Sequence, residues 1–192
     1  MNDGVKERFV TLSLEELQTI ISEAATKAAT IACDNMERKH ASRMKIERDK
    51  RLHNTNLLLK EYRTLKAGCR NAIFTKNEKV KVDDVIEEIM EAKNDAVVVE
   101  SIKRSAERTE IILDHIDNAL EIFRMSCAKG GEKEKRSYKV IKGLYINKEE
   151  KSIKELAKEF EVSEVTIHGD IKSAKEKLSV LFFCIDGLRF YQ

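Results

Sequence analysis

The stretch SIKELAKEFEVSEVTIHGDIKSAKEKL, residues 152–178, has the apolar spacing of two short helices that cross at a tight turn. Ser152 and Glu155 form a capping box, S-x-x-E, which satisfies free backbone N–H groups at a helix start. Ala157 is small enough for a close helix crossing, and Val162 is the apolar residue of the turn. The expected inward faces are Ile153, Leu156, Ala157 and Phe160 in the first helix, and Ile167, Ile171, Ala174 and Leu178 in the second. This pattern predicts a helix-turn-helix, the motif that places its second helix in the major groove of DNA.

The turn of this motif departs from the usual pattern at Glu161. Glycine is usual at this place, because the chain there takes a left-handed conformation. If Glu161 keeps that conformation, the cost is roughly 1 kcal/mol. An ordinary helical hairpin remains the alternative interpretation of the stretch.

The second helix predicts the residues that contact DNA. Ser163 is its expected cap. The expected DNA-binding residues are Ser163, Glu164, Val165, Thr166, His168, Gly169, Lys172 and Lys175, of which Glu164, Val165, His168, Gly169 and Lys172 face outward. The expected phosphate contacts are Arg43, Lys45, Arg48 and Lys154.

Composition indicates helices throughout. The 192 residues include no Pro, no Trp and only 7 Gly, and 36% of them are charged. The four cysteines are dispersed, so we expect neither a disulfide framework nor a zinc site. The longest apolar run, residues 180–185, is far shorter than a membrane span, and the first residues lack a signal pattern. We therefore expect a cytoplasmic, nucleoid-associated protein of a bacterial host cell, with no membrane partner.

Charge is segregated along the chain although the net charge is only +2. Residues 37–70 carry 11 basic and 4 acidic side chains, a net +7, whereas residues 83–122 carry 4 and 12, a net −8. An acidic central region would repel phosphates, while the basic region and the C-terminal module would attract them. DNA contact is therefore expected at two regions at most.

Two long helices are expected before the motif. A capping box at Ser13 and Glu16 begins the first, whose apolar seam steps by three and four residues through Leu14, Leu17, Ile21, Ala24, Ala28 and Ile31. A second helix of around 30 residues follows Asn94, and Asp83 is the expected cap of a short helix before it. The two seams bury each other within one chain or across a dimer, and the sequence leaves both open.

The predicted fold class is all-α: a long N-terminal helical hairpin or coiled-coil-like region followed by a small C-terminal helix-turn-helix domain. Lys129-Gly130-Gly131 is the expected boundary, because paired glycines interrupt a helical chain. Residues 1–131 form the expected oligomerisation or partner-contact region, and residues 132–192 the expected DNA-binding domain. A polar stretch, residues 67–77, is predicted to be a loop within the first region.

The C-terminal module resembles that of phage late-transcription activators of the ArpU/RinA type. The residues that carry the resemblance are Tyr138 and Tyr145, the stretch TIHGDI at 166–171, and the ending LSVLFFCIDGL at 178–188. Cys184 stands where the family usually has Gly, and His168-Gly169 replaces a pair that is often aromatic or basic. The resemblance covers about a quarter of the chain and also implies similarity to the sigma-factor domain that reads the upstream promoter element.

The expected function is therefore sequence-specific activation of transcription in a phage or mobile element, acting on late genes. Double-stranded DNA, host RNA polymerase and a second copy of the chain, forming a homodimer, are the expected partners. The alternative is a DNA-packaging adaptor resembling a small terminase subunit, which would form a ring of many subunits. The two alternatives differ in assembly and in DNA site.

No catalytic site is predicted. The four histidines, His40, His53, His115 and His168, are expected on separate helices without matched carboxylates or cysteines, and no phosphate-binding glycine loop occurs. His115 between Asp114 and Asp117 is not a metal site on this interpretation, because neighbouring residues of a helix do not face each other. We therefore expect a protein that is not an enzyme and has neither cofactor nor metal.

Overall fold

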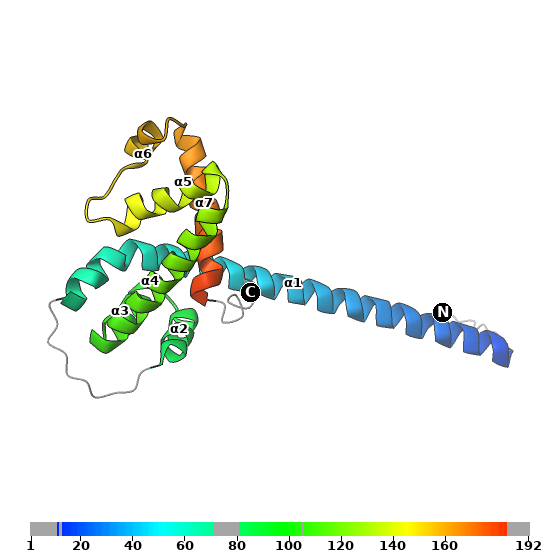
Figure 1. The fold of residues 1–192 in the computed structure, drawn as a ribbon. Helices are drawn as coiled ribbons and strands as arrows, with labels where there is room; N and C mark the ends of the chain where they lie inside the picture. The colour runs from blue at the N-terminus through cyan, green and yellow to red at the C-terminus, as the bar shows by residue number, and fades with distance from the viewer. Residues whose placement is uncertain (1–10, 12, 71–80, 105, 184–192) are drawn as a thin grey trace, which may run out of the picture. The chain divides into compact units, whose positions relative to one another are not determined.

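A computed structural model describes residues 11, 13–70, 81–104 and 106–183 of the chain. The described residues are helical with no strand, so the all-α prediction is confirmed (Figure 1). The chain divides into two compact units, Met1–Glu47 and Arg48–Gln192. The second unit includes residues on both sides of Gly130-Gly131. The expected boundary at residue 131, between a partner-contact region and a DNA-binding domain, remains a prediction.

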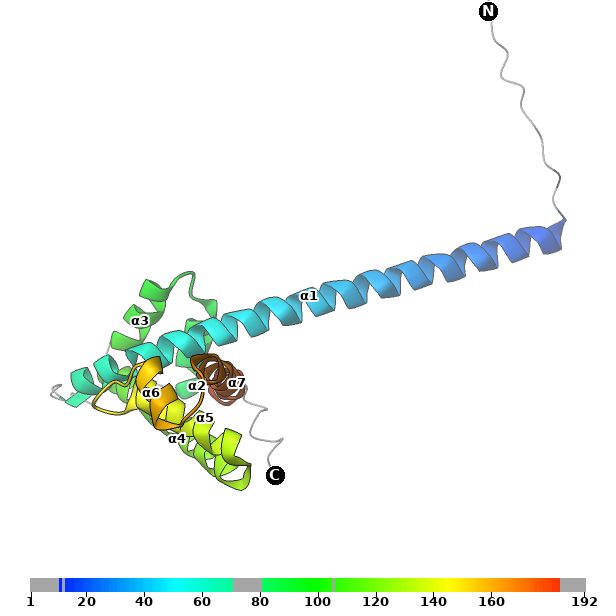
Figure 2. The same cartoon turned by 90° about the horizontal axis from the view of Figure 1, so that it is seen from above.

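The first helix, α1, spans Leu14–Arg70 (Figure 2). Its capping box forms as predicted: the Glu16 N–H donates to Ser13 Oγ over 3.2 Å, and the Ser13 N–H donates to Glu16 Oε2 over 2.8 Å. The loop prediction for residues 67–77 is wrong at its start, because α1 continues to Arg70. Leu65 is buried and Cys69 packs against the core, so packing extends the helix past Gly68. The remainder of the predicted loop lies outside the described residues.

The helix α2 spans Val82–Glu91, and the predicted cap is wrong. Lys81 occupies the cap position and makes no side-chain cap hydrogen bond, while Asp83 lies in the first turn. There its carboxylate adds negative charge next to the free N–H groups of the helix start, an interaction that is favourable without a cap.

The predicted helix of 30 residues after Asn94 is two helices, α3 (Asp95–Lys103) and α4 (Ala106–Lys129). Asn94 caps α3 as expected, since its side chain accepts from the Val97 N–H. At the other end, Arg108 Nε donates to the Ser101 carbonyl over 2.9 Å, and Thr109 Oγ1 donates to the Ile102 carbonyl over 3.0 Å. Side chains seven residues farther along the chain thus satisfy carbonyls that a continuous helix would have bonded through its backbone.

The C-terminal part consists of α5 (Glu132–Ile141), a π-helical turn η1 (Lys142–Ile146), α6 (Ile153–Glu159) and α7 (Glu164–Phe183). α7 contacts α4, α5 and α6. Its last turn buries Phe182 and half-buries Leu181, which favours a core role for this part of the ending. Ile185 and Leu188, which continue the spacing of Leu181 and Phe182 in the sequence, lie outside the described residues.

Two apolar clusters hold the second unit together. The larger joins the end of α1 to α2, α3 and α4 and reaches α5 and the second half of α7. α1 supplies Leu58, Leu59, Tyr62 and Leu65 to it, so this part of the long-helix pair closes within one chain. The smaller cluster lies inside the helix-turn-helix: Val140, Leu144, Leu156, Ala157, Ile167 and Ile171.

Candidate nucleic-acid interface

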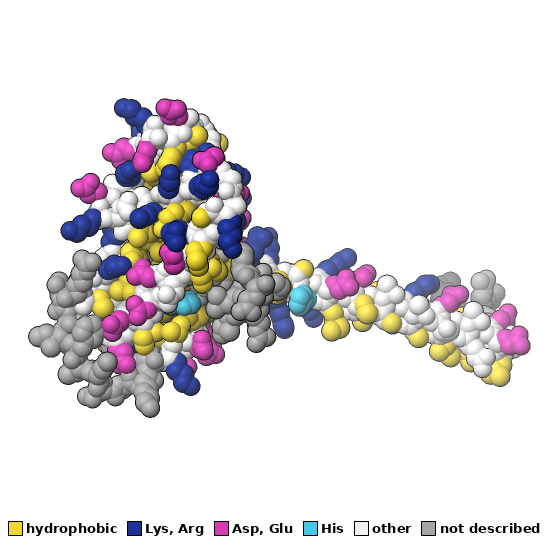
Figure 3. Space-filling view, in the orientation of Figure 1, with side chains coloured by type: hydrophobic (Ala, Val, Ile, Leu, Met, Phe, Trp, Pro, Cys, Tyr) yellow, Lys and Arg dark blue, Asp and Glu magenta, His cyan; other side chains and the backbone are white. Residues whose placement is uncertain are grey.

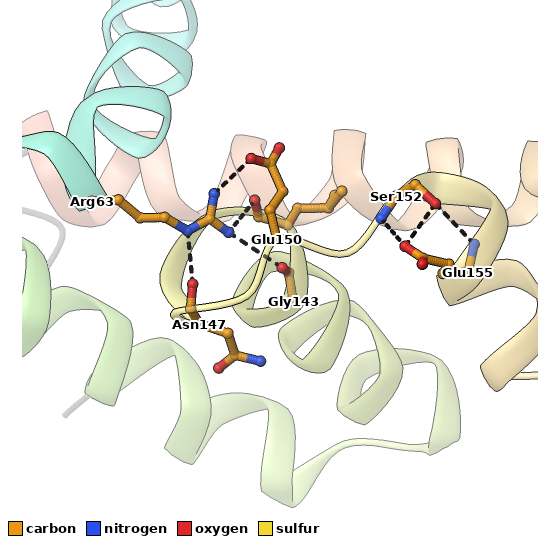
Figure 4. Close-up of polar contacts among 7 residues, drawn as sticks. Arg63, Gly143, Asn147, Glu150, Ser152 and Glu155 are labelled. Atoms are coloured by element: carbon orange, nitrogen blue, oxygen red, sulfur yellow. Dashed lines mark hydrogen bonds and ion pairs between the residues drawn. The ribbon is translucent and has the colours of Figure 1, made fainter.

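The first helix of the motif, α6, begins at the predicted capping box (Figure 4). The Glu155 N–H donates to Ser152 Oγ over 3.2 Å, and the Ser152 N–H donates to Glu155 Oε2 over 2.7 Å. These hydrogen bonds from the backbone and hydroxyl of Ser152 lower the pKa of Glu155 below its ordinary value. The carboxylate therefore stays ionised and fixes the entry of the chain into the motif.

The turn between α6 and α7 is a Schellman motif. Glu161 is in the left-handed region with φ 53°, as the sequence predicted for this place. The Val162 N–H donates to the Ala157 carbonyl over 3.0 Å, and the Glu161 N–H donates to the Lys158 carbonyl over 3.3 Å. Val162 packs against the smaller apolar cluster, so the turn has the apolar contact that usually accompanies this motif.

The second helix of the motif, α7, begins at Glu164, directly after Ser163. Ser163 Oγ accepts from the Thr166 N–H over 3.1 Å and lies 2.9 Å from Thr166 Oγ1. The predicted cap is therefore present. Both hydroxyls lie at the N-terminus of α7, where backbone N–H groups favour an anion such as a DNA phosphate.

The four residues predicted to face inward from α7 are all buried: Ile167, Ile171, Ala174 and Leu178. The first two belong to the smaller cluster and the last two to the larger one. One apolar face thus joins the motif to the rest of the second unit, and it leaves the opposite face of the first turns exposed.

The exposed residues of the first turns are Glu164, Val165, His168, Gly169 and Lys172, which we call the outer face of α7. Val165 is 79% exposed, so its apolar side chain is open to a partner. A Cβ atom built on Gly169 would have no heavy atom within 4 Å, so packing does not require glycine here. The structure therefore groups five of the eight predicted DNA-binding residues on one open surface, beside Ser163 and Thr166.

Lys175 lies farther along α7 and is half-buried. Its Nζ donates to Asn56 Oδ1 of α1 over 2.6 Å and lies 5.1 Å from the centre of the Tyr145 ring. Both contacts tie α7 to other elements of the second unit. Lys175 thus has a structural role in addition to any role at DNA.

The predicted phosphate contacts lie on two helices. Lys154 is exposed in the first turn of α6, next to the capping box. Arg43, Lys45 and Arg48 are exposed on α1, where Arg48 Nη2 lies 3.7 Å from Asp49 Oδ1. The boundary between the two compact units falls between Lys45 and Arg48.

One buried ion pair in the motif was missed in the sequence. Arg136 Nε of α5 donates to Asp170 Oδ2 of α7 over 2.6 Å, and Asp170 is 1% exposed. The sequence does contain a sign of this pair, because the acidic residue Asp170 lies between two inward-facing isoleucines, Ile167 and Ile171. An Asp at that place requires a cationic or hydrogen-bonding partner on the helix that it faces.

A second missed contact holds the turn before α6 (Figure 4). The Arg63 guanidinium donates to the carbonyls of Leu144 and Asn147, each over 2.7 Å, and to Gly143 over 3.4 Å. Its Nη1 also lies 3.1 Å from Glu150 Oε2. Arg63 thereby satisfies carbonyls at the end of η1 and joins α1 to the motif.

The histidines lie on different parts of the fold, and two of them contact polar groups of other elements. His40 and His53 share α1, so the expectation of four separate helices is wrong. His53 Nε2 lies 2.6 Å from Asp95 Oδ1, and His115 Nε2 lies 3.0 Å from the Phe182 carbonyl. Among the described residues, no group of three or more His, Cys, Asp or Glu side chains is arranged to hold a metal ion. None of the described helices is both long and apolar enough to cross a membrane.

Comparison with known proteins identifies the motif. A family model described as an HTH domain matches residues 136–189, about a quarter of the chain. No curated protein and no solved structure matched the chain. The matched range contains the Arg136–Asp170 pair, the capping box and the outer face of α7. The chain therefore carries a DNA-binding helix-turn-helix.

Proposed function

We propose that this protein is a sequence-specific transcription activator of a phage or mobile element, acting on late genes. The observation that carries the DNA-binding part is the outer face of α7. It is exposed at the start of the second helix of the motif, while the opposite face of the helix is fixed in two apolar clusters. A helix held in this way presents its first turns to the major groove with little freedom to reorient.

The chemistry of the outer face suggests roles for three of its side chains. Glu164 would accept from a cytosine amino group, Lys172 would donate to guanine or phosphate, and Val165 would contact a thymine methyl group. Ser163 and Thr166 would bind phosphate at the N-terminus of α7. Lys154, in the first turn of α6, would contact a further phosphate of the DNA backbone.

Specific binding needs more than one such module, because a single helix reads only a few base pairs. We infer that a homodimer doubles the half-site and that the basic residues Arg43, Lys45 and Arg48 add affinity for phosphate. In this account residues 132–192 read DNA, and residues 1–131 provide self-association and a surface for host RNA polymerase. The resemblance to phage late activators supports the assignment to transcription.

Two measurements test this proposal. Binding-site selection from a random DNA library should enrich one sequence with half-sites related by two-fold symmetry, and a reporter gene placed after that sequence should be activated. The matched control carries Glu164→Ala, Val165→Ala and Lys172→Ala together, changes confined to exposed positions, and should lose enrichment without losing its thermal unfolding transition. Enrichment of no sequence would contradict the proposal.

Light scattering separates the activator from the packaging adaptor. The activator should remain a dimer in the presence of its DNA site. A ring of many subunits would instead support the small terminase-like alternative.

A further inference from the structure

The first half of α1 carries an apolar seam that the described residues of its own chain leave exposed. The seam consists of Leu14, Leu17, Ile21, Ala24, Ala28 and Ile31. Its large members are 73%, 44%, 59% and 60% exposed in the order Leu14, Leu17, Ile21, Ile31. Hydrophobic side chains accordingly gather along one side of this part of α1 (Figure 3).

The second half of the same helix behaves differently. Leu58, Leu59, Tyr62 and Leu65 are almost completely buried, because α2, α3 and α4 cover them. The same helix thus contains one apolar stripe that its own chain buries and another that its own chain leaves exposed. An exposed stripe with alternating three- and four-residue steps is the pattern that a second helix covers by knobs-into-holes packing.

We propose that a second copy of the chain covers this seam, and that the two helices pair antiparallel. This inference deepens the proposed homodimer by naming the surface and the direction of pairing. In the antiparallel register Leu14 lies opposite the partner's Ile31, Leu17 opposite the partner's Ala28, and Ile21 opposite the partner's Ala24. The overlap from residue 14 to residue 31 is about 26 Å long.

Side-chain size favours this direction. The four central layers then each join one large and one small residue, so these layers have similar volumes, and the two end layers each pair Leu14 with Ile31. A parallel in-register pair would instead stack Ala24 on Ala24 and Ala28 on Ala28 in successive layers. The paired alanines would leave empty space between the helices, because the neighbouring layers of paired Leu or Ile hold the helix axes farther apart. Side chains that line such a space lose dispersion attraction.

Charge favours the same direction. The seam positions after Ile31 are polar: Asn35, Arg38, Ser42 and Lys45. A parallel pair would place Arg38 and Lys45 each opposite its own copy, where like charges repel. The antiparallel overlap ends at Ile31 and leaves these cations beyond the partner's seam, available to DNA. In an antiparallel pair the dipoles of the two helices also point in opposite directions, which is more favourable than parallel dipoles side by side.

Cysteine crosslinking tests the direction of pairing in the full chain without DNA. Cys33 and Cys69 are not buried and Cys184 lies outside the described residues, so all three are first replaced by Ser. Three samples are then treated with a short thiol crosslinker: Leu14→Cys alone, Ile31→Cys alone, and an equal mixture of the two. Antiparallel pairing predicts crosslinked dimer in the mixture and little in either single sample. Equal crosslinking in the single samples would show parallel pairing and overturn the proposal.

Sedimentation tests whether the seam is the surface. Ile21→Asp should turn the dimer into a monomer at the same concentration. Thr26→Asp adds the same charge on the opposite side of the helix and should leave the dimer intact. A wild-type chain that stays monomeric into the high micromolar range, or equal effects of the two changes, would overturn the proposal. Since DNA is absent, either result leaves the assignment of α7 to base reading untouched.

Discussion

Arg136 Nε lies 2.6 Å from Asp170 Oδ2, and this buried ion pair joins α5 to α7 directly behind the outer face. Asp170 is almost fully buried, whereas Arg136 retains some exposure. The pair therefore fixes the rotation of α7 relative to the rest of the motif, in addition to the apolar contacts of Ile167 and Ile171.

Removing the carboxylate of this pair should destabilise the protein strongly. Asp170→Ala leaves the Arg136 charge without its partner, and we expect the free energy of unfolding in urea to fall by about 3–5 kcal/mol. Glu176→Ala removes an exposed carboxylate from the same helix and should change it by less than about 0.5 kcal/mol. Equal effects of the two substitutions would show that the pair does not stabilise the fold.

The left-handed residue of the turn offers a stabilising substitution. Glu161→Gly removes the cost of a left-handed side-chain residue, although glycine also loses more entropy on folding, so we expect a net gain of up to about 1 kcal/mol. Lys158→Gly, at the penultimate residue of α6, should lose about 0.5–1 kcal/mol because that residue is right-handed helical. Thermal denaturation of both variants checks the contrast. A loss at Glu161→Gly as large as at Lys158→Gly would contradict the turn geometry.

Gly169 should show opposite effects on stability and on DNA binding. It lies in an exposed helical turn with open space at its Cβ, so Gly169→Ala should stabilise α7 by about 0.8–1 kcal/mol. The added methyl group would obstruct close approach of DNA and should lower operator affinity by about tenfold or more. Gly68→Ala in α1, which also has open space, should stabilise without changing binding. Unchanged operator affinity of Gly169→Ala would place the DNA away from this residue.

The sequence predicted the motif well because its signals are local. The capping boxes at Ser13 and Ser152 and the left-handed place of Glu161 depend on residues three to five positions apart, and all three were confirmed. The four inward residues of α7 follow from helical spacing alone. These features need no knowledge of distant partners.

Other features depended on tertiary contacts that local spacing does not show. The break between α3 and α4 follows from side chains of Arg108 and Thr109 that reach back to α3, and apolar spacing runs across it undisturbed. The partner of Asp170 lies 34 residues away in sequence, and Arg63 reaches carbonyls 80 or more residues away. The contact of Lys175 with Asn56, 119 residues away in sequence, likewise could not be found from local spacing.

The basic residues of α1 should contribute affinity without specificity. Reversing the charge of Arg43, Lys45 and Arg48 removes phosphate neutralisation but no base contact. The slope of log affinity against log salt should become shallower by about 0.9 for each phosphate that is no longer neutralised. Affinity for operator and for random DNA should fall nearly alike, so their ratio stays roughly constant. An unchanged slope would mean that this segment does not touch DNA.

The central claim is that the outer face of α7 reads bases, and base preference is the quantity that tests it. Binding-site selection is carried out with single Ala substitutions at Glu164, Val165, His168, Gly169 and Lys172. The account predicts that Glu164→Ala relaxes the preference at one base pair by roughly 1–3 kcal/mol while the rest of the site is kept. Sequence preference identical to the wild type in all five variants would contradict it.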